Sequence, residues 1–242
     1  MRCRRTISPT QASAENSSEK IVIVPDILRK ASHVGIVGGS GTGKTEYGVR
    51  YLMMSRHDRV FIFDHQGEYP SRLGKLAVPC TTLSAVVNAC EDYRIVLYDP
   101  ADEFGGEFEN ALAVWSDLVF ELAKASEESG VETLAYCDEL QKIVSVNNTP
   151  RELKNLLQTG RKFKLDTCFV SQQPNRMPNE VREQWTELVT FRLKDPASLE
   201  ALDNFGLSDE EISDIANLPD LHYIWRHLQR GESVTGVLQF SR

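Results

Sequence analysis

Short apolar runs alternate along the chain with longer segments in which apolar residues recur at helical spacing. The apolar runs predict strands at residues 34–37, 59–63, 94–98, 133–137, 167–170 and 188–193. The segments between them predict helices at residues 46–55, 107–126, 150–159 and 196–205. Strands that alternate with helices form a mainly parallel sheet with helices on both faces, so the pattern predicts an α/β fold.

The two ends of the chain follow other patterns. Residues 1–19 are polar and rich in serine, which is typical of a flexible tail, and residues 21–24 predict a first short strand. Residues 222–225 and 234–240 predict a closing β-hairpin. Because 242 residues suffice for one α/β domain and leave little for a second, we expect residues 20–242 to form a single domain.

One segment matches the phosphate-binding pattern G-x-x-x-x-G-K-[ST] in full. Its residues are Gly38, Gly39, Ser40, Gly41, Thr42, Gly43, Lys44 and Thr45. The glycines let the backbone approach a polyphosphate and turn its N–H groups inward, and the start of the next helix adds partial positive charge. The amine of Lys44 can reach the β- and γ-phosphates, and the hydroxyl of Thr45 can bind Mg²⁺. Since a predicted strand precedes the motif and a predicted helix follows it, a site for ATP and Mg²⁺ is favoured over a glycine-rich turn without a ligand.

Polar residues follow several predicted strands, at the edge where open α/β sheets bind ligands. Asp138 and Glu139 follow the strand at 133–137, and Asp138 comes 94 residues after Lys44. An aspartate in that place can hold Mg²⁺, directly or through water, and the next glutamate can polarise the attacking water. The same pair can also be an ordinary acidic turn after a strand. The phosphate-binding motif upstream favours the catalytic interpretation.

Gln172 and Arg161 are the other candidate catalytic residues. Gln172 ends the predicted strand at 167–170 and can either sense the γ-phosphate or satisfy loop backbone. Arg161 belongs to a locally basic segment of an acidic chain. It can serve as an arginine finger for a neighbouring subunit, as part of a strip that follows a phosphate backbone, or as a solvated helix end. The basic residues of that segment are Arg151, Lys154, Arg161, Lys162 and Lys164.

A polar turn follows the strand at 59–63. It reads Asp64-His65-Gln66-Gly67-Glu68-Tyr69, and Asp64 and Glu68 are both expected near the nucleotide edge of the sheet. Residue chemistry alone assigns no role to either carboxylate. A lone histidine such as His65 is more often a surface or hydrogen-bonded residue than a metal ligand.

Composition restricts the class of protein. The net charge of −8 argues against a surface that wraps nucleic acid as a whole, so any DNA contact is expected in a small region. The five cysteines show no metal-binding spacing, and Cys137 and Cys168 fall in apolar runs, which favours buried, reduced thiols. No apolar run approaches the roughly 18 residues that span a bilayer, so we expect no transmembrane segment.

Four blocks of the sequence together resemble the HerA–FtsK superfamily of P-loop ATPases. The superfamily has the phosphate-binding loop, a strand ending in D-x-x-G-E-Y, a strand ending in D-E, and a G-R-K block followed by Q-x-P. The corresponding blocks here are residues 38–45, 63–69, 137–139 and 160–174, in the same order. The resemblance implies a RecA- or FtsK-like P-loop fold. It also implies a ring, usually a hexamer, that moves double-stranded DNA through its pore, with Arg161 as a finger acting on the neighbouring subunit and Gln172 as the nucleotide sensor.

The length of the chain narrows the resemblance further. A bare ATPase core of this size looks like the genome-packaging ATPases of membrane-containing, double-jelly-roll viruses. This implies a location in the host cytoplasm and at a capsid vertex, with a vertex or viral membrane protein as partner. DNA contacts are expected in the loop after Asp138-Glu139 or in the basic segment; the loop candidates are Lys142, Asn147, Asn148 and Arg151.

Three alternatives to a packaging ATPase stay open at this point. A minimal cellular or plasmid-borne DNA translocase would carry the same motifs. A small-molecule kinase would need an arginine-rich lid and an acceptor pocket, and no clear lid is found in the sequence. A nucleotide-switched binding module would not need Glu139 beside Asp138.

Overall fold

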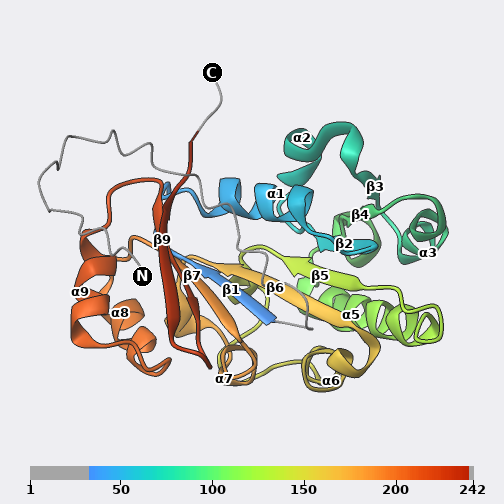
Figure 1. The fold of residues 1–242 in the computed structure, drawn as a ribbon. Helices are drawn as coiled ribbons and strands as arrows, with labels where there is room; N and C mark the ends of the chain where they lie inside the picture. Colours follow the sequence, from blue (N-terminus) through green and yellow to red (C-terminus); the bar gives the residue numbers. More distant parts are fainter. Residues whose placement is uncertain (1–32, 240–242) are drawn as a thin grey trace, which may run out of the picture.

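The computed structural model describes residues 33–239 (Figure 1). The tail predicted at residues 1–19 and the strand predicted at 21–24 lie outside the described residues, as does residue 240 of the predicted hairpin. In the part that is described, the mainly parallel α/β fold with a C-terminal antiparallel hairpin is confirmed.

The strands of residues 33–239 form one nine-stranded sheet in the order β3-β4-β2-β5-β6-β1-β7-β8-β9. Their bounds are β1 His33–Val37, β2 Arg59–Phe63, β3 Val78–Cys80, β4 Ile95–Tyr98, β5 Thr133–Cys137, β6 Leu165–Ser171, β7 Glu187–Phe191, β8 His222–His227 and β9 Glu232–Val237. Neighbours from β3 to β7 are parallel, and β8 and β9 are antiparallel. Because β1 lies between β6 and β7, the loop that follows β1 emerges in the interior of the carboxyl edge of the sheet.

The helices that connect these strands agree with the apolar periodicity where they are long. Their bounds are α1 Lys44–Met54, α2 Tyr69–Leu73, α3 Leu83–Asp92, α4 Ala101–Phe104, α5 Phe108–Ala125, α6 Arg151–Thr159, α7 Asn179–Arg182, α8 Pro196–Asp203 and α9 Asp209–Asn217. The predicted helices at 107–126 and 150–159 are α5 and α6, each within one residue at either end. No helix within residues 33–239 has the length and apolar character needed to cross a membrane.

The apolar pattern missed several elements, both short and of moderate length. They include α2, β3 and α3 at one edge of the sheet, and α9 near the other (Figure 1). α9 does carry a local signal, since Ser208 and Glu211 form a complete capping box at its start. β6 begins two residues before the predicted start, because buried Asp166 lies 2.8 Å from the ring of His57 and is thereby tolerated inside the strand.

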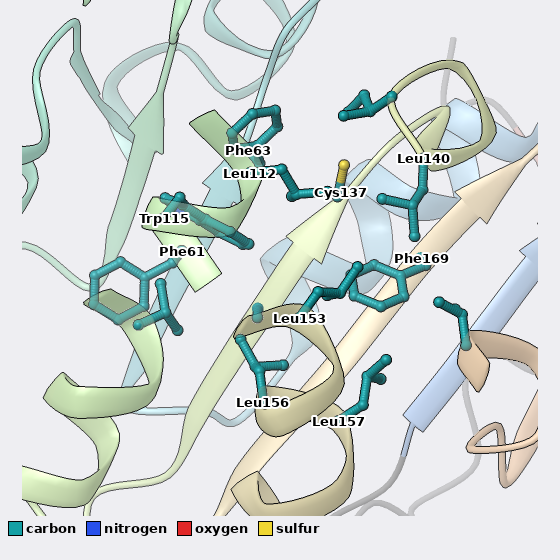
Figure 2. Close-up of a cluster of buried hydrophobic side chains, with 14 of the residues drawn as sticks. Phe61, Phe63, Leu112, Trp115, Cys137, Leu140, Leu153, Leu156, Leu157 and Phe169 are labelled. Carbon is teal, nitrogen blue, oxygen red and sulfur yellow. The ribbon is translucent and has the colours of Figure 1, made fainter. Parts of the chain in front are cut away.

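Successive side chains of each strand point to opposite faces of the sheet, so the sheet is covered by a hydrophobic layer on each face. On one face, Phe61 and Phe63 of β2 pack with α5 and α6, whose residues Trp115 and Leu156 are fully buried (Figure 2). On the other face, Ile62 packs with the residues of α1. The cysteines of the described part are buried free thiols, as the apolar runs around Cys137 and Cys168 predicted. The core therefore holds the carboxyl ends of β1, β2, β5 and β6 at one edge, where the polar motifs lie.

Candidate nucleotide-binding and hydrolysis site

The loop between β1 and α1 turns sharply around two glycines. Gly41 and Gly43 have φ values of 73° and 112°, in the left-handed region that favours glycine. Space also restricts position 43, because a Cβ there would lie 3.0 Å from Cδ1 of Leu238. The backbone therefore turns sharply into the start of α1, with left-handed residues of the kind that occur in anion-binding turns.

Gly38 and Gly39 anchor this loop to the sheet. The N–H of Gly38 donates to the carbonyl of Ser171 at 3.3 Å, and that of Gly39 donates to the carbonyl of Arg192 at 2.8 Å. A Cβ at position 38 would lie 2.5 Å from Cβ of Phe191. These two N–H groups, expected in the sequence analysis to face a phosphate, are therefore engaged with β6 and the end of β7. The donors left for an anion begin at Ser40.

The start of α1 is rich in backbone donors. The first N–H that bonds along the helix is that of Tyr47, to the carbonyl of Gly43 at 2.9 Å. The N–H groups just before it belong to the opening turn of the helix, where the helix dipole favours an anion. Thr45 lies half-buried in this turn, and Thr42 donates its hydroxyl to the carbonyl of Gly39 at 2.8 Å.

Lys44 folds back over the loop. Its Nζ donates to the carbonyl of Gly39 at 2.8 Å, and the side chain is buried. Burial lowers the pKa of Lys44, while the nearby charges of Glu139 and Asp138 oppose that shift. The ammonium group therefore lies in the field of both carboxylates that the sequence analysis singled out.

Asp138 directly follows β5 and is held by two donors. Its Oδ1 accepts the N–H of Glu139 at 2.8 Å, and its Oδ2 accepts the hydroxyl of Tyr69 at 2.8 Å. Burial raises the pKa of Asp138 to about 6, with the charge of Glu139 acting in the same direction and the Tyr69 hydrogen bond acting against it. The carboxylate is thus a fixed oxygen donor at the carboxyl edge of the sheet, between the ends of β2 and β6.

Glu139 has an unusual backbone conformation. Its φ is 53° and its ψ is 38°, which is the left-handed region for a residue that carries a Cβ. The carboxylate accepts a hydrogen bond from the side-chain amide of Gln141, and its Oε2 lies 3.6 Å from Nζ of Lys142. Strained backbone of this kind concentrates at functional sites, where the surrounding structure maintains it.

We expect Glu139→Gly to be more stable than Glu139→Ala by about 1 kcal/mol, because only glycine adopts this backbone without a Cβ penalty. Both variants lose the carboxylate and its contacts, so the difference isolates the backbone. Urea denaturation of the two variants measures it. Equal stability, or a more stable alanine variant, would contradict strain at this position.

The polar turn after β2 positions a buried tyrosine. Asp64 accepts the N–H of Glu68 on Oδ1 at 3.1 Å and the N–H of Tyr69 on Oδ2 at 3.0 Å. Asp64 is therefore a structural anchor for the start of α2. Glu68 is exposed and pairs with Arg72 at 3.5 Å. Tyr69 is a site residue that the sequence analysis missed, since no spacing rule connects it with Asp138.

His65, in the same turn, is partly withdrawn from solvent. Burial lowers its pKa to about 4, and the charge of Lys142 adds to this effect. The ring is thus neutral near pH 7. Nζ of Lys142 donates to Oε1 of Gln66 at 3.2 Å, so the turn after β2 contacts the turn that carries Glu139.

Gln172 lies at the carboxyl edge of the sheet, half-buried, one residue after β6 ends. Its predecessor Ser171 provides the carbonyl that anchors Gly38. The end of β6 is therefore joined to the loop after β1 by a backbone hydrogen bond.

Arg161 lies at the opposite end of the sheet. It belongs to the turn before β6, and its Nη2 donates to the carbonyl of Gln184, just before β7. Burial lowers the pKa of His33, the first residue of β1, to about 4, and the positive charge of Arg161 acts in the same direction. The five residues of β1, on the order of 15 Å of extended chain, separate His33 from the phosphate loop. Arg161 therefore does not join the site of its own chain.

The other candidates for DNA contact have mixed surroundings. Lys154 forms an ion pair with Glu180 at 2.7 Å, and Lys164 donates to the carbonyl of Gly130 at 3.0 Å. Asn148 donates to Glu109 at 2.6 Å. The side chains of Arg161 and Lys162 are exposed to solvent.

The C-terminal hairpin completes the wall beside the phosphate loop. The N–H of Leu221 donates to the carbonyl of Thr42 at 3.1 Å, and that of Leu238 donates to the carbonyl of Leu221 at 2.9 Å. Arg50 of α1 donates to the carbonyl of Gln239 at 2.6 Å. The hairpin therefore supports the loop and α1, and its removal would expose both.

Comparison of the sequence with protein-family models and with curated proteins gave no match. Solved structures, by contrast, are similar in fold. The genome-packaging NTPase B204 of Sulfolobus turreted icosahedral virus 2, in complex with AMPPCP, has a TM-score of 0.65 at 16% identity, over 85% of this chain and 97% of that chain.

Two further structures share the architecture. VirB4 of Thermoanaerobacter pseudethanolicus has a TM-score of 0.62 at 15% identity, over 88% of this chain and 91% of that one. The bacterial conjugative coupling protein TrwB has a TM-score of 0.61 at 13% identity, over 87% and 85% of the two chains. These structures therefore confirm the fold that the four sequence blocks indicated.

Proposed function

We propose that this chain is an ATPase that moves double-stranded DNA, and that it packages a viral genome into a preformed capsid. The convergence of Lys44, Asp138 and Glu139 at the carboxyl edge of the sheet carries the proposal. Hydrolysis of a nucleoside triphosphate requires phosphate binding, a metal ligand and a group that orients water, and these three residues are suited to those tasks. The likeness in fold to a viral genome-packaging NTPase supports the biological setting.

The residues present fit ATP and Mg²⁺. The donor-rich start of α1 and the ammonium of Lys44 suit the β- and γ-phosphates, and Lys44 would exchange the Gly39 carbonyl for a phosphate oxygen. The hydroxyl of Thr45 and the carboxylate of Asp138 are oxygen donors of the kind that Mg²⁺ prefers, and each oxygen of Asp138 accepts one hydrogen bond and keeps further lone pairs. When bound, the metal neutralises charge on the phosphate oxygens.

Hydrolysis would begin with the release of Glu139. Its carboxylate, now engaged by Gln141 and Lys142, would turn to accept a hydrogen bond from the attacking water and align it with the γ-phosphate. Gln172 would detect the loss of that phosphate through the segment that anchors Gly38. We also propose that residues 20–242 form one domain, which carries all of these residues.

A ring of subunits would complete the site. Arg161 lies at the end of the sheet opposite the phosphate loop of its own chain, so the guanidinium can stabilise the transition state only at a neighbour. We propose a homo-oligomeric ring, in the form of a hexamer, with DNA in its pore. The complex would act in the host cytoplasm and at a capsid vertex, where a vertex or viral membrane protein would hold it.

The ATPase rate of the full chain, with and without linear double-stranded DNA of several kilobases, tests the proposal. We expect Mg²⁺-dependent hydrolysis that rises severalfold with DNA and falls again as salt is raised, because phosphate contacts are screened. Hydrolysis that stays constant over the whole range of DNA concentrations would contradict a DNA motor. Short single-stranded DNA of equal nucleotide concentration is the control for nonspecific polyanion effects.

A further inference from the structure

A short chain of buried hydroxyl groups ends on Asp138. The hydroxyl of Tyr136 lies 2.6 Å from that of Tyr69, and Tyr69 donates to Oδ2 of Asp138 at 2.8 Å. A phenol has one proton to donate. Since Tyr69 gives its proton to the carboxylate, Tyr136 must donate to Tyr69, and the order of the chain is fixed.

We propose that Tyr69 is a positioning residue for Mg²⁺ binding, and that its hydroxyl holds the carboxylate of Asp138 in the orientation that the metal requires. The inference rests on the proposed function, because it assigns Asp138 to the metal. Tyr69 and Asp138 are 69 residues apart in the chain and come from α2 and the end of β5.

Two donors together determine the orientation of the carboxylate. Tyr69 occupies one lone pair of Oδ2, and the N–H of Glu139 occupies one lone pair of Oδ1. With a donor on each oxygen, rotation about the bond to the carboxyl carbon would break at least one hydrogen bond in a buried place, which is costly. Such outer contacts orient metal ligands, and their loss typically weakens metal binding by about 10- to 100-fold.

Tyr69 is itself held rigidly. Asp64 accepts its backbone N–H at 3.0 Å, and its ring packs edge-to-face on Tyr136, with 5.4 Å between centroids. Only 1% of Tyr69 is exposed. α1 closes over the pair at Gly48, where a Cβ would lie 2.2 Å from the hydroxyl of Tyr136. The helix that begins at the phosphate loop thus rests on the same hydroxyl chain that ends on Asp138.

The test compares Tyr69→Phe with Tyr136→Phe, two substitutions that each delete one buried hydroxyl. Binding of a fluorescent ATP analogue is titrated against Mg²⁺ in a Glu139→Gln background, and binding in EDTA is measured alongside. For Tyr69→Phe we expect the half-saturating Mg²⁺ concentration to rise about tenfold, with affinity in EDTA unchanged. Tyr136→Phe keeps the bond to Asp138, and its Mg²⁺ requirement should stay within twofold of the parent.

The double variant Tyr69→Phe/Tyr136→Phe leaves no hydroxyl without a partner in this pair, so it separates metal binding from folding defects. It should show the same rise as Tyr69→Phe. An unchanged Mg²⁺ requirement in both folded variants that lack the Tyr69 hydroxyl would overturn the inference. Mg²⁺-dependent hydrolysis without any response to DNA would overturn the DNA motor instead and leave the role of Tyr69 intact.

Discussion

Glu139→Gln should bind ATP with the affinity of the unmodified protein and hydrolyse it roughly 10²- to 10⁴-fold more slowly, the range typical of losing a general base. Glutamine keeps the size of the side chain and one acceptor oxygen, but it cannot accept a proton from the attacking water. Lys44, the start of α1 and Asp138 are untouched, so the phosphates and the metal keep their partners. Single-turnover hydrolysis and equilibrium binding of an ATP analogue measure the two effects separately.

Glu68→Gln is a matched control for this variant. Glu68 is an exposed glutamate that forms a surface ion pair with Arg72, and the same loss of charge there should leave hydrolysis within about twofold. Near-normal turnover in Glu139→Gln would remove Glu139 from the role of the base. Loss of ATP binding in that variant would point to a defect in the loop instead.

Arg161→Ala should lose about 10³-fold or more in hydrolysis while it keeps its affinity for ATP, as expected for an arginine finger. The loss of binding is not expected, because Arg161 is separated from its own phosphate loop by the length of β1. Arg230→Ala is the matched control: Arg230 is an exposed arginine after β8, at the end of the sheet where β7 begins, and it has no place in the proposed site.

Mixing two inactive chains decides whether Arg161 acts on a neighbour. Lys44→Ala lacks a working phosphate loop but keeps Arg161, and Arg161→Ala has the converse defect. In a mixed ring, some interfaces combine an intact site with an intact finger, so hydrolysis should return when the two are mixed. Mixtures as inactive as their components, under conditions in which the unmodified chain forms rings, would contradict action between subunits.

The central strands and the phosphate loop were predicted from the sequence because both are encoded locally. Strands buried on both faces must be continuous apolar runs, and β2 and β5 were predicted with the bounds that they have in the structure. The loop needs its glycines, Lys44 and Thr45 within eight consecutive residues. Asp138 and Glu139 could be placed because parallel strands all end at the same edge of a sheet.

Tertiary structure alone decided what depends on residues distant in the chain. The hydrogen bond from Tyr69 to Asp138 exists because β2 and β5 are neighbours, and no local pattern contains that fact. The anchoring of Gly38 and Gly39 requires the ends of β6 and β7 beside β1, and the hydrogen bond from Arg161 to the carbonyl of Gln184 joins the turn before β6 to the segment before β7. Local sequence thus determined the glycine-rich loop between β1 and α1 and the candidate residues at the carboxyl edge, whereas strand order determined their contacts, because side-chain contacts follow from spatial neighbours rather than from spacing along the chain.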